Sequence, residues 1–97
     1  MTAPLCDADF TAHIGKRVRF AGWHGALRLE SVEAQPRSTM PGAARTPFTL
    51  IFHGQAGDVL AEGLYRASIE QGPELDLYIM PIHTVTPGRQ EYQVVFN

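Results

Sequence analysis

The sequence predicts an all-β fold: a six-stranded, mainly antiparallel barrel or sandwich with one short N-terminal helix. Six short segments alternate polar and apolar residues, and turn residues separate them at intervals of about ten residues, a pattern typical of such folds. No connection after the first strand can hold a crossover helix, so a parallel α/β sheet is not expected. The 97 residues fit one domain, 1–97, with a single core.

Residues 1–15 are expected to form a lead-in segment that contains the one short helix. Asp7 can cap the start of this helix, and Gly15 can end it. Phe10 and Ile14 lie one turn apart and share a face. Because a helix of about two turns is not stable alone, we expect both side chains to pack against the rest of the domain.

The first two strands are predicted at 17–20 and 26–34, with a glycine-flanked hairpin connection at 22–25 between them. The first strand alternates arginines with apolar residues that should face the core. In the second strand, Val32 falls on the opposite parity from the apolar residues before it. We therefore expect a bulge or bend near Ser31 that returns Val32 to the core side.

Residues 35–47 contain several prolines and no apolar alternation, and we expect a long loop there. A domain boundary is excluded because neither flanking part is long enough to fold alone. The default expectation is a spacer loop, but the loop exceeds the length usual in compact domains, and the alternative is an arm that orders when a partner binds. The third strand, predicted at 48–53, is the most hydrophobic segment of the chain.

The remaining strands are predicted at 63–70, 75–82 and 91–96, each with apolar residues at alternate positions. Pro81 cannot donate a hydrogen bond, so it should lie at an edge or at the end of its strand. Residues on the apolar parity of their strands form the expected core: Phe20, Leu29, Leu50, Phe52, Tyr65, Leu77, Ile79, Val94 and Phe96.

The charge of the chain argues against polyanionic partners. The formal net charge is −2, and seven of the eight basic residues are arginines spread along the sequence. Since nucleic acids and anionic membranes bind concentrated basic surfaces, neither is an expected partner. The single cysteine, Cys6, cannot form an internal disulfide, and no apolar run suits a signal peptide or a membrane span. We therefore expect a cytoplasmic protein.

No catalytic, cofactor or metal site is expected from the residue pattern. His13, His24, His53 and His83 form no short-spaced ligand pair, although the last two end predicted strands and could meet at one rim. Cys6 has no neighbour that would lower its pKa, and no serine lies in a nucleophile elbow. The glycine-containing turn after the third strand precedes no helix that could bind phosphate. We expect a protein without enzymatic activity.

Motifs along most of the chain carry a resemblance to a known group. They are a Phe10…Gly15 pair, Pro47–Phe52, Gly63–Arg66, Leu77–Pro81 and Tyr92–Asn97. With these, the chain resembles a family of uncharacterised small bacterial all-β domains, some found near phage-tail-collar-like genes. The resemblance implies no activity, but it favours an assembly role, with incorporation into an exported or phage-like assembly as a possible destination. The sequence departs from that family at Glu62, where its members have glutamine, and in the long loop.

The expected function is therefore a non-enzymatic protein-interaction or assembly module that is phage-tail-like associated. The alternative is a small-molecule-binding β-barrel. Such a barrel should contain an apolar cavity of at least about 300 Å³ with a few converging polar groups. An assembly module should instead have a filled interior and an exposed edge or apolar patch.

Five residues are candidate contacts with a protein partner. Trp23 can anchor a partner from its predicted loop, or fold back over the open end of the sheets. Arg37 and Arg45 belong to the long loop. Gln93 and Val95 lie on the last strand, which we expect at a sheet edge with weak protection, so that a second copy could add there as a homodimer. The alternative is that this strand pairs with the first one and closes a barrel.

Overall fold

In the computed structural model, the described residues (7–34, 47–83 and 87–96) form six strands and one short helix, which confirms the all-β fold. Every predicted strand is present, and its ends differ from the prediction by at most two residues. The elements are α1 (Ala8–Thr11), β1 (Arg17–Phe20), β2 (Ala26–Ala34), β3 (Phe48–Gln55), β4 (Gly63–Ile69), β5 (Glu74–Ile82) and β6 (Arg89–Phe96).

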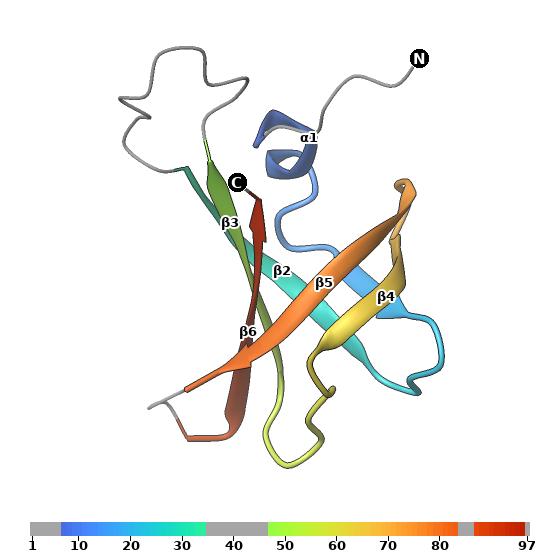
Figure 1. The fold of residues 1–97 in the computed structure, drawn as a ribbon, viewed down its shortest axis with the longest axis vertical. Helices are drawn as coiled ribbons and strands as arrows, with labels where there is room; N and C mark the ends of the chain where they lie inside the picture. The colour runs from blue at the N-terminus through green and yellow to red at the C-terminus, as the bar shows by residue number, and fades with distance from the viewer. Residues whose placement is uncertain (1–6, 35–46, 84–86, 97) are drawn as a thin grey trace.

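The strands close into an antiparallel barrel in the order β1-β2-β3-β6-β5-β4 (Figure 1). Neighbours in sequence pair as β1–β2, β2–β3, β4–β5 and β5–β6. Two further contacts, β3–β6 and β1–β4, join strands that are distant in sequence. Phe20 of β1 lies opposite Ala67 of β4 at the closure. The fold is thus the barrel and not the two-layer sandwich.

β6 lies between β3 and β5 in the wall of the barrel, and no whole side of it is free. It pairs with β3 over eight residues, and this register turns the apolar residues of both strands inward. Gln93 lies opposite Ile51 of β3 on one side and opposite Met80 of β5 on the other. The prediction of a free sheet edge is therefore wrong for Gln93, whereas Val95, beyond the end of the β5–β6 ladder, pairs with Thr49 of β3 alone. The alternative closure of β6 onto β1 is also wrong, because β4 occupies that place.

The seam between β5 and β6 is short. Its ladder runs from Met80 opposite Gln93 to Ile82 opposite Glu91. Toward the end of the barrel where α1 lies, the two strands diverge (Figure 1). Within the described part of the chain, residues 74–79 of β5 therefore pair with β4 alone.

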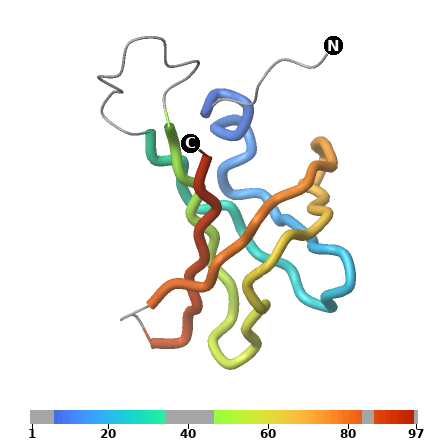
Figure 2. Tube along the Cα trace, viewed as in Figure 1, coloured from blue at the N-terminus to red at the C-terminus, as the bar shows by residue number. Residues whose placement is uncertain are grey.

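The helix α1 covers the end of the barrel where β6 terminates (Figure 2). Asp7 caps it, and the ring of Phe10 lies 5.8 Å from that of Phe48 and 5.5 Å from that of Phe96, measured between centroids. Phe10 is buried, as predicted, whereas Ile14 is exposed. The prediction for Ile14 is wrong because the helix ends after one turn, so the two residues no longer share a face.

The barrel interior is filled by side chains. Seven of the nine predicted core residues are buried, and the other two, Tyr65 and Phe96, are half-buried against them. Phe20 and Phe52 meet edge to face at 6.1 Å in the centre. The fully buried Tyr92 accepts a hydrogen bond from the backbone N–H of Leu60 at 2.9 Å through its hydroxyl oxygen. This bond ties the connection before β4 to the core.

The bulge expected in β2 is confirmed. The pairing with β3 shifts register between Leu29 and Ser31, and Val32 packs against the core. The extra residue, Glu30, and Ser31 both lie on the side of β2 away from the fully buried positions. Of the predicted loop 35–47, only its last residue is among those the structure describes.

Candidate functional site

The structure places three of the five predicted contact residues. Trp23 is half-buried and packs against the core, and its indole covers Gly25 so closely that a Cβ there would lie 3.0 Å from the ring. Trp23 thus folds back over the barrel. Gln93 is half-buried within the wall, and Val95 is exposed beside it. Arg37 and Arg45 lie outside the described residues.

Large apolar side chains face solvent on the outer side of β4, β5 and β6. Leu64, Tyr78 and Val95 are 68%, 48% and 42% exposed. Leu64 lies directly opposite Tyr78 across the β4–β5 pair. Met80 of β5 lies opposite Gln93 of β6, and this is the last pair of the ladder between the two strands. Tyr78 and Val95 each lie two residues beyond that pair, and therefore on the same outer side of their strands. We call the surface of Leu64, Tyr78, Met80 and Val95 the outer apolar face.

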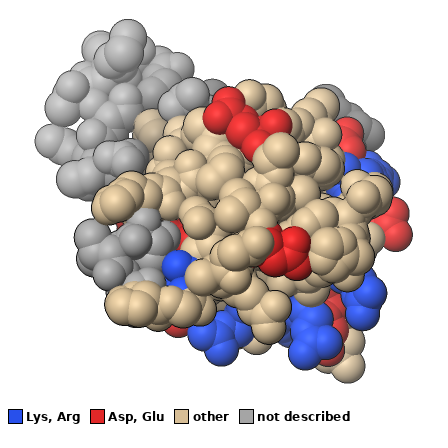
Figure 3. Space-filling model, turned by 90° about the horizontal axis from the view of Figure 1, so that it is seen from below, with Lys and Arg blue, Asp and Glu red and all other residues tan. Residues whose placement is uncertain are grey.

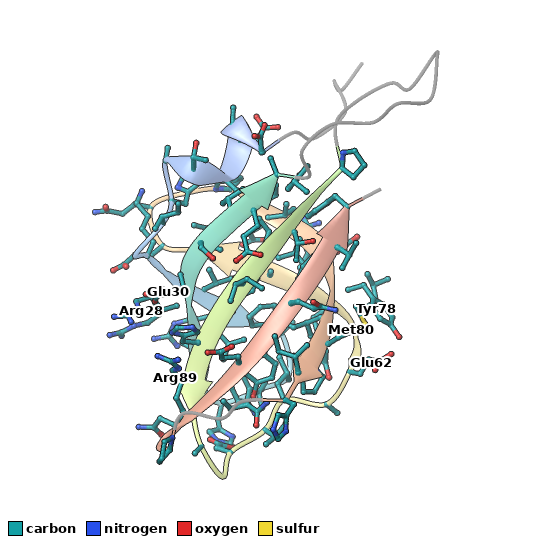
Figure 4. All side chains as sticks on the ribbon, turned by 90° about the vertical axis from the view of Figure 1, so that its left-hand side faces the viewer. Arg28, Glu30, Glu62, Tyr78, Met80 and Arg89 are labelled. Carbon is teal, nitrogen blue, oxygen red and sulfur yellow. The ribbon has the colours of Figure 1, made fainter. Side chains whose placement is uncertain are left out.

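The orientation of Tyr78 is set by a carboxylate at the border of this face. Its hydroxyl donates a hydrogen bond of 2.7 Å to Glu62 Oε2, and Figure 4 shows the two side chains together on the outside of the barrel. That hydrogen bond raises the pKa of Tyr78 above 10.0, with desolvation and the negative charge of Glu62 acting in the same direction. The phenol therefore remains a neutral donor at physiological pH.

A chain of ionic contacts crosses the outer side of β2, β3 and β6. Arg28 Nη2 lies 2.9 Å from Glu30 Oε2, and Arg89 Nη2 lies 2.8 Å from Glu91 Oε2. His53 stands between the two carboxylates, 3.4 Å from Glu30 and 3.5 Å from Glu91, with its side chain only 14% exposed. The bulge in β2 supplies the position of Glu30 in this chain. The two arginines are thereby held at its ends.

A hollow of about 470 Å³ lies on the outer surface next to these contacts. We call it the arginine hollow, because Arg17, Arg28 and Arg89 line it together with Glu70. A second hollow of about 380 Å³ adjoins it by sharing Arg17, and Arg19 belongs to its lining. Seen from below, basic side chains gather along one side of the molecule (Figure 3). Arginines that are dispersed in the sequence are thus concentrated by the fold.

The two surfaces lie on opposite sides of the barrel. In Figure 4, Tyr78 and Met80 point away from one side, while Arg28 and Arg89 lie at the other. The sequence analysis predicted neither surface, although the sequence contains an indication of each. Leu64 and Tyr78 are large apolar residues at positions where strand alternation requires polar ones. Pairing the two strands of the predicted first hairpin also brings arginines of both strands to one face.

Neither a metal centre nor a membrane helix emerges from the described ranges. No group of three or more His, Cys, Asp or Glu side chains in them could hold a metal ion. No helix among them is long and apolar enough to cross a bilayer. His53 is engaged with Glu30 and Glu91, and His83 is exposed at the end of β5.

These features define a small closed antiparallel β-barrel domain with a helix at one end, an apolar face and a separate basic hollow on its outer wall. A family model described as a domain of unknown function (DUF6916) matches residues 5–96. The chain therefore belongs to this family, an uncharacterised one, as the resemblance implied. No curated protein and no solved structure matches the chain.

Proposed function

We propose that this domain is a non-enzymatic protein-interaction module that associates with a second copy of itself through the outer apolar face. One observation carries the proposal: Leu64 and Tyr78 are exposed directly opposite each other on β4 and β5, and Val95 is exposed on the outer side of the neighbouring strand β6. Isolated exposed apolar residues are ordinary, but two large ones directly opposite each other on paired strands, with further apolar side chains on the same outer side, are typical of a contact site. Tyrosine is also enriched among residues that dominate interface energetics.

The border of the face suits contact between two identical surfaces. Arg66 lies on the outer side of β4, 3.5 Å from carboxylate oxygens of both Glu74 and Asp76. These exposed pairs are long and contribute little to stability, so they can exchange partners cheaply. In a two-fold dimer the apolar centres meet, and each Arg66 can reach a carboxylate of the other copy. A twofold contact needs only one such self-complementary surface.

The short seam between β5 and β6 adds a second source of affinity at the same place. Residues 74–79 of β5 pair only with β4 within the described chain, so their other side offers backbone groups next to Tyr78. Extended segments commonly bind sheets by adding to such an edge. Strand-mediated association would therefore use the open side of β5 at residues 74–79, or that of β6 at residues 94–96, and not the full length of β6.

The filled interior supports this reading over the alternative of a ligand-binding barrel. Phe20, Phe52 and Tyr92 occupy the centre, and the hollows at the described residues open on the outside. We further propose a phage-tail-like assembly as the setting, on the strength of the sequence resemblance. Self-association through a two-fold contact would suit a part of such an assembly.

Light scattering coupled to size exclusion, run across the micromolar range, tests the proposal. The wild type should exceed the monomer mass of 10.7 kDa as its concentration rises. Leu64→Glu should weaken association about tenfold or more, because it sets a charge in the centre of the contact. Val59→Glu is the matched control, since Val59 is 50% exposed but lies outside the face. A mass of 10.7 kDa at every concentration, or equal loss in both variants, would refute the proposal.

A further inference from the structure

The barrel sets like charges side by side in the arginine hollow. Arg17 of β1 lies directly opposite Arg28 of β2, and Arg19 follows on the same outer side of β1. Like charges at directly opposed positions destabilise an antiparallel pair. Nothing in the core requires them there, because these side chains point away from it. An arrangement that costs stability and serves no packing role indicates a ligand.

The arginines of the hollow are only partly neutralised. Arg28 contacts Glu30, and Arg89 contacts Glu91. His53 lies between these two carboxylates. The guanidinium groups of Arg17 and Arg19 form no salt bridge with any residue that the structure describes. Glu30 and Glu91 offset the charges of Arg28 and Arg89, and Glu70 lines the arginine hollow as well. Among the described arginines of the two hollows, the positive charges without an ion-pair partner are therefore those of Arg17, which lines both hollows, and Arg19, which lines the adjoining one.

The walls of the hollow leave room for a ligand. Gly15 and Gly88 line it at turns with positive φ, where glycine is favoured, and a Cβ at either position would have no heavy atom within 4 Å. Its volume of about 470 Å³ lies within the range typical of small-molecule sites. The adjoining hollow extends the space toward Trp23 and Arg19.

We propose that the arginine hollow binds a small ligand that carries two or more linked phosphate groups. The planar guanidinium group donates paired hydrogen bonds to phosphate oxygens, and Arg17 and Arg28 face one hollow from adjacent strands. Glu70 and Asp58 at the borders, with a net charge of −2 for the chain, disfavour a long polyanion that would run past the hollow. The site is separate from the outer apolar face and independent of its role.

Titration of the full chain with sodium tripolyphosphate tests this proposal, with pyrophosphate and a nucleoside triphosphate in parallel. The single tryptophan, Trp23, lines the adjoining hollow and serves as a fluorescence reporter, alongside calorimetry. We expect saturable binding of one ligand per chain that weakens as salt is raised. Tighter binding of the nucleotide than of tripolyphosphate would identify a nucleoside-bearing ligand, and equal binding would identify the phosphate chain alone.

Arg17→Gln should weaken tripolyphosphate binding about tenfold or more, whereas the matched control Arg66→Gln, on β4 and outside the hollow, should leave it unchanged. The melting temperature of ligand-free Arg17→Gln separates binding from structure. It should equal or exceed that of the wild type, because the substitution removes repulsion from Arg28. A lower melting temperature would mean that Arg17 is structural.

Three results overturn the proposal. The first is the absence of saturable binding of any of the three phosphate compounds at millimolar concentration. The second is binding that Arg17→Gln and Arg66→Gln weaken equally. The third is binding of a single-stranded oligonucleotide that is tighter than that of tripolyphosphate and strengthens with oligonucleotide length, which would indicate a nucleic-acid surface.

Discussion

The outer apolar face and the arginine hollow belong to the same barrel wall, but the sequence builds them in opposite ways. On the apolar face, Leu64 and Tyr78 break the alternation of their strands by putting large apolar groups on the solvent side. In the hollow, Arg17 and Arg28 obey the alternation, and the conflict arises only when the hairpin sets them opposite each other. An apolar contact surface can therefore be detected where a strand departs from polar–apolar alternation. A charged site can arise in strands that keep the alternation, and it then becomes visible only when the strand pairing is known.

Both surfaces depend on one shared support, the core beneath them. Phe52→Ala should have the largest effect of any change considered, because Phe52 is buried in the centre and meets Phe20 edge to face. We expect a loss of about 3–5 kcal/mol in the free energy of unfolding. Since small domains have about 5–15 kcal/mol in total, this loss would unfold a domain near the lower end of that range, and association and phosphate binding would then fail together.

Denaturant unfolding of Phe52→Ala measures this effect, with Leu64→Ala as the surface reference. The latter should change stability by about 0.5 kcal/mol or less, because Leu64 is exposed. Unfolding of Phe52→Ala at the denaturant concentration of the wild type would contradict the assignment of the core.

Removing a hydroxyl should cost more stability at the buried Tyr92 than at the exposed Tyr78. Tyr92→Phe should cost about 1–3 kcal/mol, because it leaves the backbone N–H of Leu60 buried without its acceptor. Tyr78→Phe removes an exposed hydrogen bond to Glu62 and should change stability by about 0.5 kcal/mol or less. Equal losses in the two variants, measured by denaturant unfolding, would contradict this difference.

The same buried tyrosine predicts how stability depends on pH. Burial raises the pKa of Tyr92 above 10.0, although the hydrogen bond from Leu60 opposes the shift. The unfolded chain therefore loses this proton first as the pH rises. The contribution is present below pH 10.0 and is lost as the pH rises from 10.0 through the higher pKa of the folded state. Thermal melting between pH 9 and 12 should show a weaker decline in Tyr92→Phe than in the wild type.

The smallest expected effect concerns the ionic chain beside the hollow. Glu30→Gln removes the carboxylate that contacts Arg28 and His53, and should change stability by about 0.2–1 kcal/mol, as exposed pairs do. It should also release Arg28 toward the hollow and tighten tripolyphosphate binding about two- to threefold. Glu62→Gln, beside the apolar face, is the control and should leave that binding unchanged. Weaker binding in Glu30→Gln would mean that the ionic chain positions Arg28 for the ligand.

Much of the fold follows from the sequence, and particular residues show why. The period-two pattern locates all six strands and most of the core, and the parity change at Val32 locates the bulge in β2. The prediction that Ile14 is buried is wrong because the helix is shorter than expected. The length of a short helix depends on the residues that it packs against, and these are distant in the sequence. For Trp23 the structure shows that the ring packs over Gly25, and its contact with a partner stays a prediction.

The sequence by itself determines which residues form strands, which side of each strand faces the core, and where β2 must bulge. These properties depend on backbone preferences and side-chain alternation over a few neighbouring residues. Only the tertiary structure decides that β6 lies between β3 and β5, that β1 closes on β4, and that the outer apolar face lies opposite the arginine hollow. Strand pairing depends on contacts between distant segments, and many partners satisfy the same alternation until all strands are packed around one core.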